Sequence, residues 1–320
     1  MKQQHFEHRY QQDWQRLETA LADAKANLGQ DFPQRYRHLC HQLALAKQRR
    51  YSPQLVNRLN HLVLLSHHHF YQHNVRYRYQ FLRFVVWGFP TALRTNATYV
   101  WGAAILFVLP LLIMGLGSYV NEELIFSLMS PAEVRHVEEM YDPSAKIIGR
   151  VRQSDTDLMM FGYYIKNNIG IGFRTFASGI LFGIGAIFIL LYNGLFIGGI
   201  AGHLTQVGFA NTFYPFVIGH GAFELTAIVF SGAAGLKLGF ALLAPGAYRR
   251  VDALRNAARE AVQIVYGAML MLVIAAFLEA FWSSSSTIPN LVKYSVGAVC
   301  WLFVMGYCFF AGRAYGSQPD

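Results

Sequence analysis

The chain has few of the residues and motifs that most enzyme families require. Its three cysteines, Cys40, Cys300 and Cys308, form no CxxC pair, so we expect neither a disulfide framework nor a zinc ribbon. The sequence also contains no GxSxG motif, Walker A loop, kinase signature or nucleotide-binding glycine loop after a strand. We therefore predict that the protein is not an enzyme and carries no cofactor.

Charged residues are also scarce. They make up 14% of the chain, against about 25% in soluble domains, while apolar residues reach 54%. This composition excludes intrinsic disorder, and the uncharged runs are too long for buried core helices. Lys and Arg concentrate in residues 1–95 and from Arg249 to Arg259, whereas residues 118–172 carry more Asp and Glu. Basic segments beside apolar runs are typical of the cytoplasmic side of a membrane protein, and we predict no nucleic-acid partner.

Residues 1–80 are predicted to form a cytoplasmic domain of amphipathic helices. Apolar residues spaced three and four apart predict a first helix that ends near Gly29, and a second helix begins near Pro33. Ser52 followed by Pro53 is an N-cap and first-turn pair that predicts a third helix. The N-terminus has no apolar segment of the kind found in signal peptides, so we expect this domain to stay in the cytoplasm.

Most of the twelve histidines lie near the N-terminus, and His67, His68 and His69 are consecutive. Consecutive residues on a helix point in different directions, so these three cannot bind one ion together. We expect no metal site in this domain.

Residues 81–95 are predicted to form an interfacial elbow. The segment from Phe81 to Pro90 is apolar and aromatic but too short to span a bilayer. Trp87 would lie at headgroup depth, and Arg94 would face lipid phosphates. The alternative is that this segment is a core helix of the preceding domain.

Residues 96–313 are predicted to form a transmembrane domain. A first span begins near Thr98, and the acidic segment 118–165 is expected outside the membrane, with one or two short helices around Pro131. Glycines four residues apart within 167–202 remove side-chain bulk from a helix face and allow close helix contact. That contact is either with another helix of the chain or with a second copy, so a homo-oligomer is one expectation.

The segment from Phe213 to Leu243 is long for a single span. At ~1.5 Å per residue it would cover about 46 Å, against a hydrocarbon core of about 30 Å. A single crossing would also place the basic run that starts at Arg249 outside. We therefore predict a helix broken near Gly219 to Gly221, which enters the membrane and returns. The fold class is then all-α, a polytopic helical protein of the cytoplasmic (inner) membrane with a re-entrant pair and both termini cytoplasmic.

Ionisable side chains are rare in the apolar half, and each costs several kcal/mol near the bilayer centre. His220 and Glu224 are four residues apart and share one helix face, where they can pair. With Glu279, Asn193 and His203 they form the candidate intramembrane polar site. These residues either lock a broken helix or bind a solute, a proton or a lipid headgroup. A metal or hydrolytic centre is the weakest alternative, because HGAFE lacks the second histidine of a zinc triad, and we assign no metal.

Three motifs resemble those of one known family. They are NGLFIGGIAGH from Asn193, HGAFELTAIVFSGAAGLKLGFALLAPG from His220, and EAF from Glu279. Over residues 165–313 the chain resembles the stage II sporulation protein M family, although that family has Pro before His-Gly where Gly219 stands here. The resemblance implies an integral protein of the cytoplasmic membrane. In spore formers, such a protein anchors peptidoglycan-degrading partners.

Two functions from different classes are compatible with the sequence. The first is a non-enzymatic scaffold that recruits cell-envelope partners through exposed amphipathic segments and contacts membrane lipids through its basic domain. The alternative is a transporter or channel-like protein in which His220, Glu224 and Glu279 line a site at a helix break, as in secondary transporters.

Overall fold

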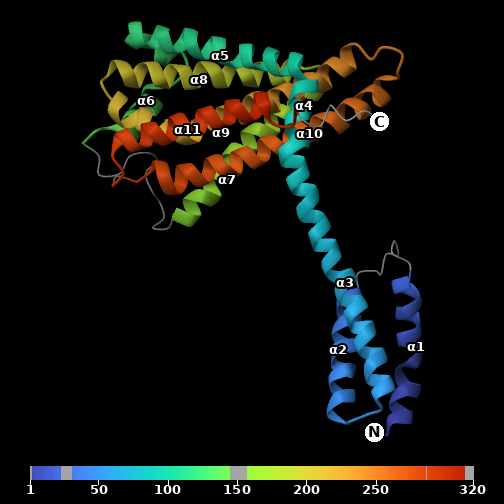
Figure 1. Cartoon of the computed structure of the whole chain (residues 1–320). Coiled ribbons are helices and arrows are strands. Elements are labelled where there is room, and N and C mark those ends of the chain that lie inside the picture. The colour runs from blue at the N-terminus through green and yellow to red at the C-terminus, as the bar shows by residue number, and fades with distance from the viewer. Residues whose placement is uncertain (1, 23–30, 145–156, 286, 314–320) are drawn as a thin grey trace. The chain divides into compact units, whose positions relative to one another are not determined.

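The computed structural model describes residues 2–22, 31–144, 157–285 and 287–313, and these form helices without any strand (Figure 1). The all-α prediction is therefore confirmed for the described part of the chain. The chain divides into two compact units, which we call the N-terminal unit (Met1–Arg83) and the bundle (Phe84–Asp320).

Three helices form the N-terminal unit: α1 (Gln3–Ala22), α2 (Phe32–Gln48) and α3 (Pro53–Arg83). The second and third begin where Pro33 and Pro53 predict, because proline fits the first turn of a helix. Their apolar faces form a separate core that includes Phe6, Trp14, Leu17, Phe32, Leu39, Leu43, Leu55, Leu59 and Leu62. The expected helix end at Gly29 and the side chain of His69 lie outside the described residues.

Polar contacts tie the three helices of this unit together. Trp14 Nε1 donates to Gln42 Oε1 across 2.7 Å in the buried core. Arg58 of α3 donates two hydrogen bonds of 2.9 Å to the carboxylate of Glu18 in α1, and its guanidinium lies 5.7 Å from the Trp14 ring centre. The hydrogen bonds from Arg58 hold the pKa of Glu18 below its ordinary value.

The bundle contains the remaining helices. In chain order they are η1 (Phe84–Gly88), α4 (Phe89–Thr95), α5 (Ala97–Val120), η2 (Glu122–Ser127), α6 (Pro131–Tyr141), α7 (Asp157–Ala177), η3 (Ser178–Ile180), α8 (Ile184–Gln206), α9 (Ala210–Leu243), α10 (Arg250–Leu278), η4 (Glu279–Ser283) and α11 (Asn290–Phe310). Among the described helices, five are long and apolar enough to cross a membrane: α5, α8, α9, α10 continued by η4, and α11. These helices make the chain a polytopic membrane protein.

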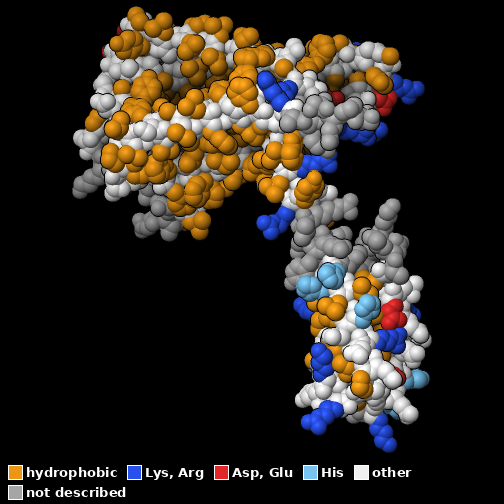
Figure 2. Space-filling view, in the orientation of Figure 1, with side chains coloured by type: hydrophobic (Ala, Val, Ile, Leu, Met, Phe, Trp, Pro, Cys, Tyr) orange, Lys and Arg blue, Asp and Glu red, His pale blue; other side chains and the backbone are white. Residues whose placement is uncertain are grey.

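Successive long helices of the bundle alternate in direction. In Figure 1, α5, α8 and α10 run one way, while α7, α9 and α11 run the other. Although α7 is less apolar than the five, it packs along α9 and α10. Hydrophobic side chains are spread over the whole visible face of the bundle, with few charged ones among them (Figure 2). Such a surface is the one that lipid tails require.

The predicted break near Gly219 to Gly221 is wrong. α9 is one continuous helix of 34 residues, and Pro215 also lies inside it. A helix that exceeds the hydrocarbon thickness can tilt, so its length does not demand a break. The chain reverses instead between α7 and α8, where Phe182 (φ 55°) and Gly183 (φ 84°) have left-handed backbone.

This reversal divides a stretch that the sequence analysis did not divide. Residues 167–202, which the sequence analysis treats as one stretch, are divided between the end of α7 and most of α8. As a result, α10 and the basic run from Arg249 begin at the same end of the bundle as α5 (Figure 1). The chain thus reverses at Phe182 and Gly183, while the orientation of the bundle in a membrane stays a prediction.

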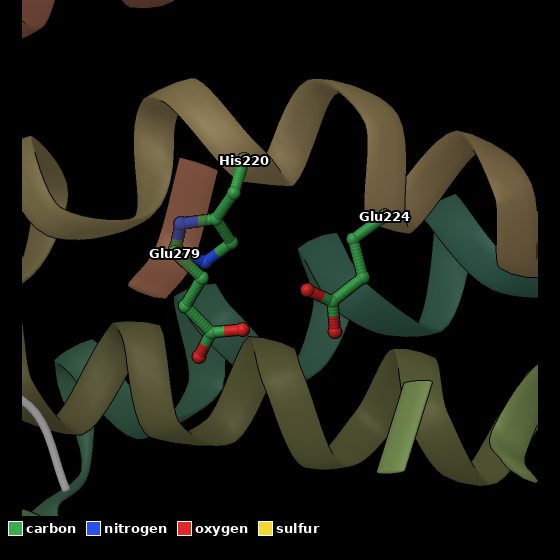
Figure 3. A group of neighbouring side chains, drawn as sticks. All are labelled: His220, Glu224 and Glu279. Atoms are coloured by element: carbon green, nitrogen blue, oxygen red, sulfur yellow. The ribbon is translucent and has the colours of Figure 1, made fainter. Parts of the chain in front are cut away.

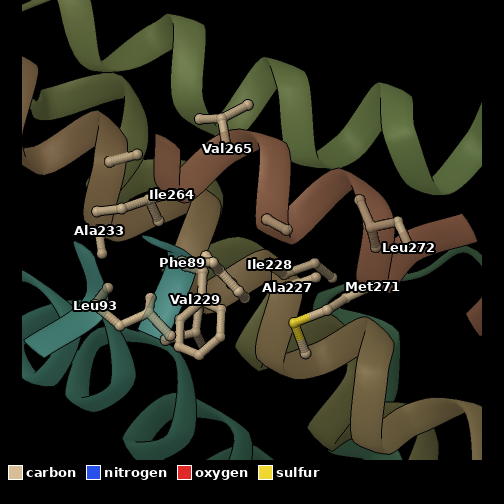
Figure 4. Close-up of a cluster of buried hydrophobic side chains, with 14 of the residues drawn as sticks. Phe89, Leu93, Ala227, Ile228, Val229, Ala233, Ile264, Val265, Met271 and Leu272 are labelled. Atoms are coloured by element: carbon tan, nitrogen blue, oxygen red, sulfur yellow. The ribbon is translucent and has the colours of Figure 1, made fainter. Parts of the chain in front are cut away.

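The segment predicted as an elbow, residues 81–95, is partly buried in the bundle. Phe89 and Leu93 of α4 lie in the core formed by α9 and α10 (Figure 4). The Phe89 ring meets Phe230 edge to face, with 5.8 Å between ring centres. The headgroup depth expected for Trp87 stays a prediction.

Glycines bring helix backbones of the bundle into direct contact. Along α8, Gly194, Gly198 and Gly202 lie against the backbone of α5, and a Cβ atom at Gly198 would be 2.2 Å from the Leu111 carbonyl oxygen. A Cβ atom at Gly239 of α9 would be 2.2 Å from the backbone that links η3 to α8. These faces are therefore occupied within one chain. Association of copies stays a prediction and would need other surfaces.

The acidic segment 118–165 contains a short helix at the expected place. α6 begins at Pro131, and Ser130 and Glu133 form a capping box: the Ser130 amide donates to Glu133 Oε2 (2.8 Å), and the Glu133 amide donates to Ser130 Oγ (3.4 Å). The Ser130 hydrogen bonds hold the pKa of Glu133 below its ordinary value. That α6 lies outside the membrane stays a prediction.

Replacing Gly198 by alanine should loosen the contact between α5 and α8. The added methyl group has no room against the Leu111 carbonyl, so we expect the free energy of unfolding to fall by about 1–3 kcal/mol. Gly219→Ala is the matched control, because a Cβ atom there meets nothing within 4 Å and alanine favours a helix. Thermal unfolding in detergent measures both. A larger loss for Gly219→Ala would contradict the continuous α9.

Glu18→Gln should destabilise the N-terminal unit in a pH-dependent way. The pKa of Glu18 is lowered in the folded state, so its stabilisation is present at neutral pH and is lost as the pH falls through the folded value. We expect a loss of under about 1 kcal/mol at pH 7, since the pair is partly exposed. Thermal unfolding followed by circular dichroism at pH 7 and at pH 3 tests this. Asp13→Asn, at an exposed position of α1, should show no such difference.

Candidate functional site

Three side chains of the candidate polar site converge between the helices of the bundle. His220 and Glu224 lie one turn apart on α9, and Glu279 is the first residue of η4. One nitrogen of the imidazole and one oxygen of each carboxylate all lie within 4.8 Å of one another. Figure 3 shows the three side chains turned toward the same space. His220 is 5% exposed, and both glutamates are half-buried.

The position of Glu279 depends on a local change of helix type. The last turn of α10 widens into the π-helical turn η4, which carries Glu279 at one end and Ser283 at the other. A hydrogen bond of 3.0 Å joins Ser283 Oγ to Nδ1 of His220, which leaves Nε2 as the ring nitrogen available to a ligand. Such turns recur at functional sites because they redirect side chains that a regular helix would place elsewhere.

Lys293 adds a third helix to this group. Its side chain is buried in the first turn of α11, and its Nζ donates to the Ser283 carbonyl oxygen across 2.9 Å. The sequence analysis did not select Lys293 or Ser283. Lys293 could have been noticed in the sequence as a lysine near the start of an apolar helix that follows Pro289. Ser283 could not, because its position depends on the π turn.

The two carboxylates dominate the electrostatics of the site. Two carboxylates this close attract a proton or a cation, and a low-dielectric surrounding strengthens that attraction. The imidazole adds a nitrogen donor from the same face as Glu224. The arrangement can therefore bind a cation, or hold a proton shared between carboxylates.

The structure does not bring the other two candidate residues into this cluster. His203, near the end of α8, is buried, and its Nε2 lies 2.8 Å from Oε1 of Glu138 in α6. Asn193 donates its side-chain amide to the Ile189 carbonyl, one turn earlier in α8. His203 thus fastens α6 to the bundle, and Glu138 is a partner that sequence spacing could not have identified.

Lys237 belongs to a separate polar contact. Its Nζ donates to Asn96 Oδ1 (2.5 Å) and to the carboxylate of Glu260 in α10. The ammonium group also lies 6.0 Å from the Tyr99 ring centre. This lysine is therefore paired within the chain and links the start of α5 to α9 and α10.

Comparison with family models covers most of the chain. The model described as Stage II sporulation protein M matches residues 103–284, which include all five candidate site residues. The chain belongs to the stage II sporulation protein M family. The resemblance seen in the sequence is thus confirmed, and the matched region covers the bundle from α5 to the end of η4.

A second family model, a domain of unknown function (DUF8413), matches residues 4–72 of this family member, within the N-terminal unit. No curated protein and no solved structure matches the chain.

His203→Gln should release α6 without disturbing the three-residue cluster. The variant removes the imidazole that contacts Glu138, so hydrogen–deuterium exchange of α6 should accelerate several-fold while exchange around His220 stays unchanged. Ser283→Ala should show the opposite pattern: exchange in η4 should accelerate, and exchange in α6 should stay unchanged. Equal effects of both variants on both regions would mean that the two groups are coupled, against the geometry described above.

Proposed function

We propose that this protein is a non-enzymatic membrane scaffold, in which the bundle anchors the chain and the N-terminal unit recruits cell-envelope partners. The observation that carries the proposal is the division of the chain into two compact units, each with its own core. A helical unit with a polar surface, covalently attached to an apolar bundle, suits recruitment to a membrane.

The packing of the bundle also supports an anchoring role. Backbone contacts along Gly194, Gly198 and Gly202 hold α8 against α5, and no side chain there can adjust to sliding. The broken helix on which a transport function was expected to depend is a continuous α9. A rigid set of contacts favours a fixed anchor over the rocking motion of an alternating-access transporter.

We further propose that the bundle lies in the cytoplasmic membrane with both termini on the cytoplasmic side. The basic residues Arg249, Arg250, Arg255 and Arg259 lie at or near the start of α10, at the end of the bundle where α5 also begins. The acidic segment 118–165 follows the opposite end of α5. This separation of charge supports the orientation through the positive-inside rule.

The recruiting surface that we propose lies at the corner between α2 and α3. Three basic residues within four positions are exposed there: Lys47, Arg49 and Arg50. They suit an acidic surface on a partner protein, and anionic lipids would compete for the same charges at about 1 kcal/mol per residue.

Site-specific photo-crosslinking in intact cells tests the scaffold proposal. A photoreactive residue at the exposed position Gln48, beside the basic residues, should give discrete protein adducts, and Arg49→Glu combined with Arg50→Glu should reduce their yield several-fold. The same probe at Leu112, an exposed residue of the apolar helix α5, serves as the control and should give no discrete protein adduct. Absence of adducts from the probe at Gln48, with the basic residues intact, would refute the proposal.

A transport function is the second candidate, and the convergence of His220, Glu224 and Glu279 favours it. The two proposals differ in the consequence of Glu224→Gln. A scaffold with this substitution keeps its crosslinks from the N-terminal unit, whereas a transporter loses solute-linked activity in reconstituted vesicles. If solute flux is equal in vesicles that contain wild-type protein and in vesicles that contain the variant, the transport proposal is refuted.

A further inference from the structure

We propose that His220, Glu224 and Glu279 bind a divalent transition-metal ion of the zinc class. The sequence analysis assigned no metal because HGAFE lacks a second histidine, but in the structure Glu279 of η4 brings a third donor atom to the group. The inference goes beyond the scaffold function and does not rest on it, because it follows from the donor atoms, charge and orientation of the three side chains. No part of the anchoring argument requires an ion at this place.

The donor atoms are close enough to share one ion. They lie within 4.8 Å of one another, and a bound zinc ion would hold nitrogen at about 2.0–2.1 Å and carboxylate oxygen at about 2.0–2.2 Å. At the tetrahedral angle, two such ligands on one ion are about 3.4 Å apart. Both glutamate side chains are half-buried and extend into the space beside the imidazole (Figure 3), so rotation about their side-chain bonds can bring the three donor atoms together.

The two carboxylates favour a divalent ion over a monovalent one. The attraction between a cation and a carboxylate rises with the charge of the cation, and a low-dielectric surrounding strengthens it. A divalent ion is therefore held more strongly than a monovalent ion at the same place.

The chemical type of the donors selects among divalent ions. Calcium and magnesium prefer oxygen ligands only, and calcium takes six to eight of them. An imidazole nitrogen beside two carboxylates suits zinc or a neighbouring transition metal. Three protein ligands leave a fourth position, which a water molecule can fill.

A second contact supports a ligand role for His220. Metal-binding histidines usually hold their other ring nitrogen in a hydrogen bond, which fixes the ring orientation and the tautomer. Ser283 Oγ provides this contact at Nδ1 across 3.0 Å, and Lys293 in turn donates to the Ser283 carbonyl. The imidazole is thus held in place from outside the cluster, with Nε2 directed to the carboxylates.

Zinc binding to the full-length protein in detergent tests the proposal. The protein is treated with a chelator, incubated with zinc alone and passed over a sizing column, and retained metal is measured by mass spectrometry. Wild type should retain one zinc ion per chain more than each of His220→Gln, Glu224→Gln and Glu279→Gln. Ser283→Ala should keep the ion but bind it about 10- to 100-fold more weakly, the usual effect of losing such an outer contact.

Matched controls come from the other histidine–glutamate pair of the bundle. His203→Gln and Glu138→Gln remove similar groups and should retain as much zinc as wild type. They also correct for weak binding by the histidine-rich N-terminal unit, since that unit is the same in all variants. Equal retention by wild type and His220→Gln would overturn the proposal.

A spectroscopic measurement covers the case in which a glutamine variant fails to fold. Cobalt(II) bound to wild type at this site should give visible absorption bands that zinc removes by competition, and wild-type protein without such bands would also overturn the proposal. The outcome is separable from that of the scaffold test. If the protein binds zinc but gives no crosslinks, the metal site is supported and the scaffold proposal is refuted. If it gives crosslinks but binds no zinc, the scaffold proposal is supported and the metal site is refuted.

Discussion

Direct contact between helix backbones, possible only where side chains are absent, is the constraint on which the bundle depends. Inside a bilayer, lipid tails are as apolar as leucine, so helices gain little by hiding apolar surface and rely on close packing. Gly194, Gly198 and Gly202 fix α8 on α5, and Gly235 and Gly239 fix α9 on η3 and the residues that follow it. Because α9 is held in this way, the positions of His220 and Glu224 follow from the packing.

Polar side chains then complete the bundle by joining helices in small groups. Lys237 links α9 to the start of α5 and to α10, His203 links α8 to α6, and His220 links α9 to η4. Each group gives a buried polar atom a partner from another helix, which a low-dielectric surrounding makes necessary. Packing and polar pairing therefore act on the same contacts between helices.

Much of this fold is readable from the sequence, because helix type, apolar length and N-terminal proline are local properties. Pro33 and Pro53 mark real helix starts, and the position of His220 and Glu224 one turn apart on α9 follows from their spacing alone. The place of the reversal is less accessible: glycines at 183 and 219 look alike in sequence, and only packing decides that Gly183 turns the chain while Gly219 stays helical. Ser283 was missed for a similar reason, since its contact with His220 depends on a π turn that no spacing rule marks.

The π turn η4 has a consequence for how α10 tolerates changes of length. A π turn holds one residue more than the α-helical turn that it replaces, so it works as a local insertion, and each residue of an α-helix advances the side chains by about 100°. A chain with one residue fewer between Glu279 and Ser283 could form a regular helix here, with ordinary hydrogen bonds throughout. Its backbone would be more regular, yet Ser283 would be turned away from His220. The number of residues in this turn therefore sets the geometry of the cluster as much as their identity does.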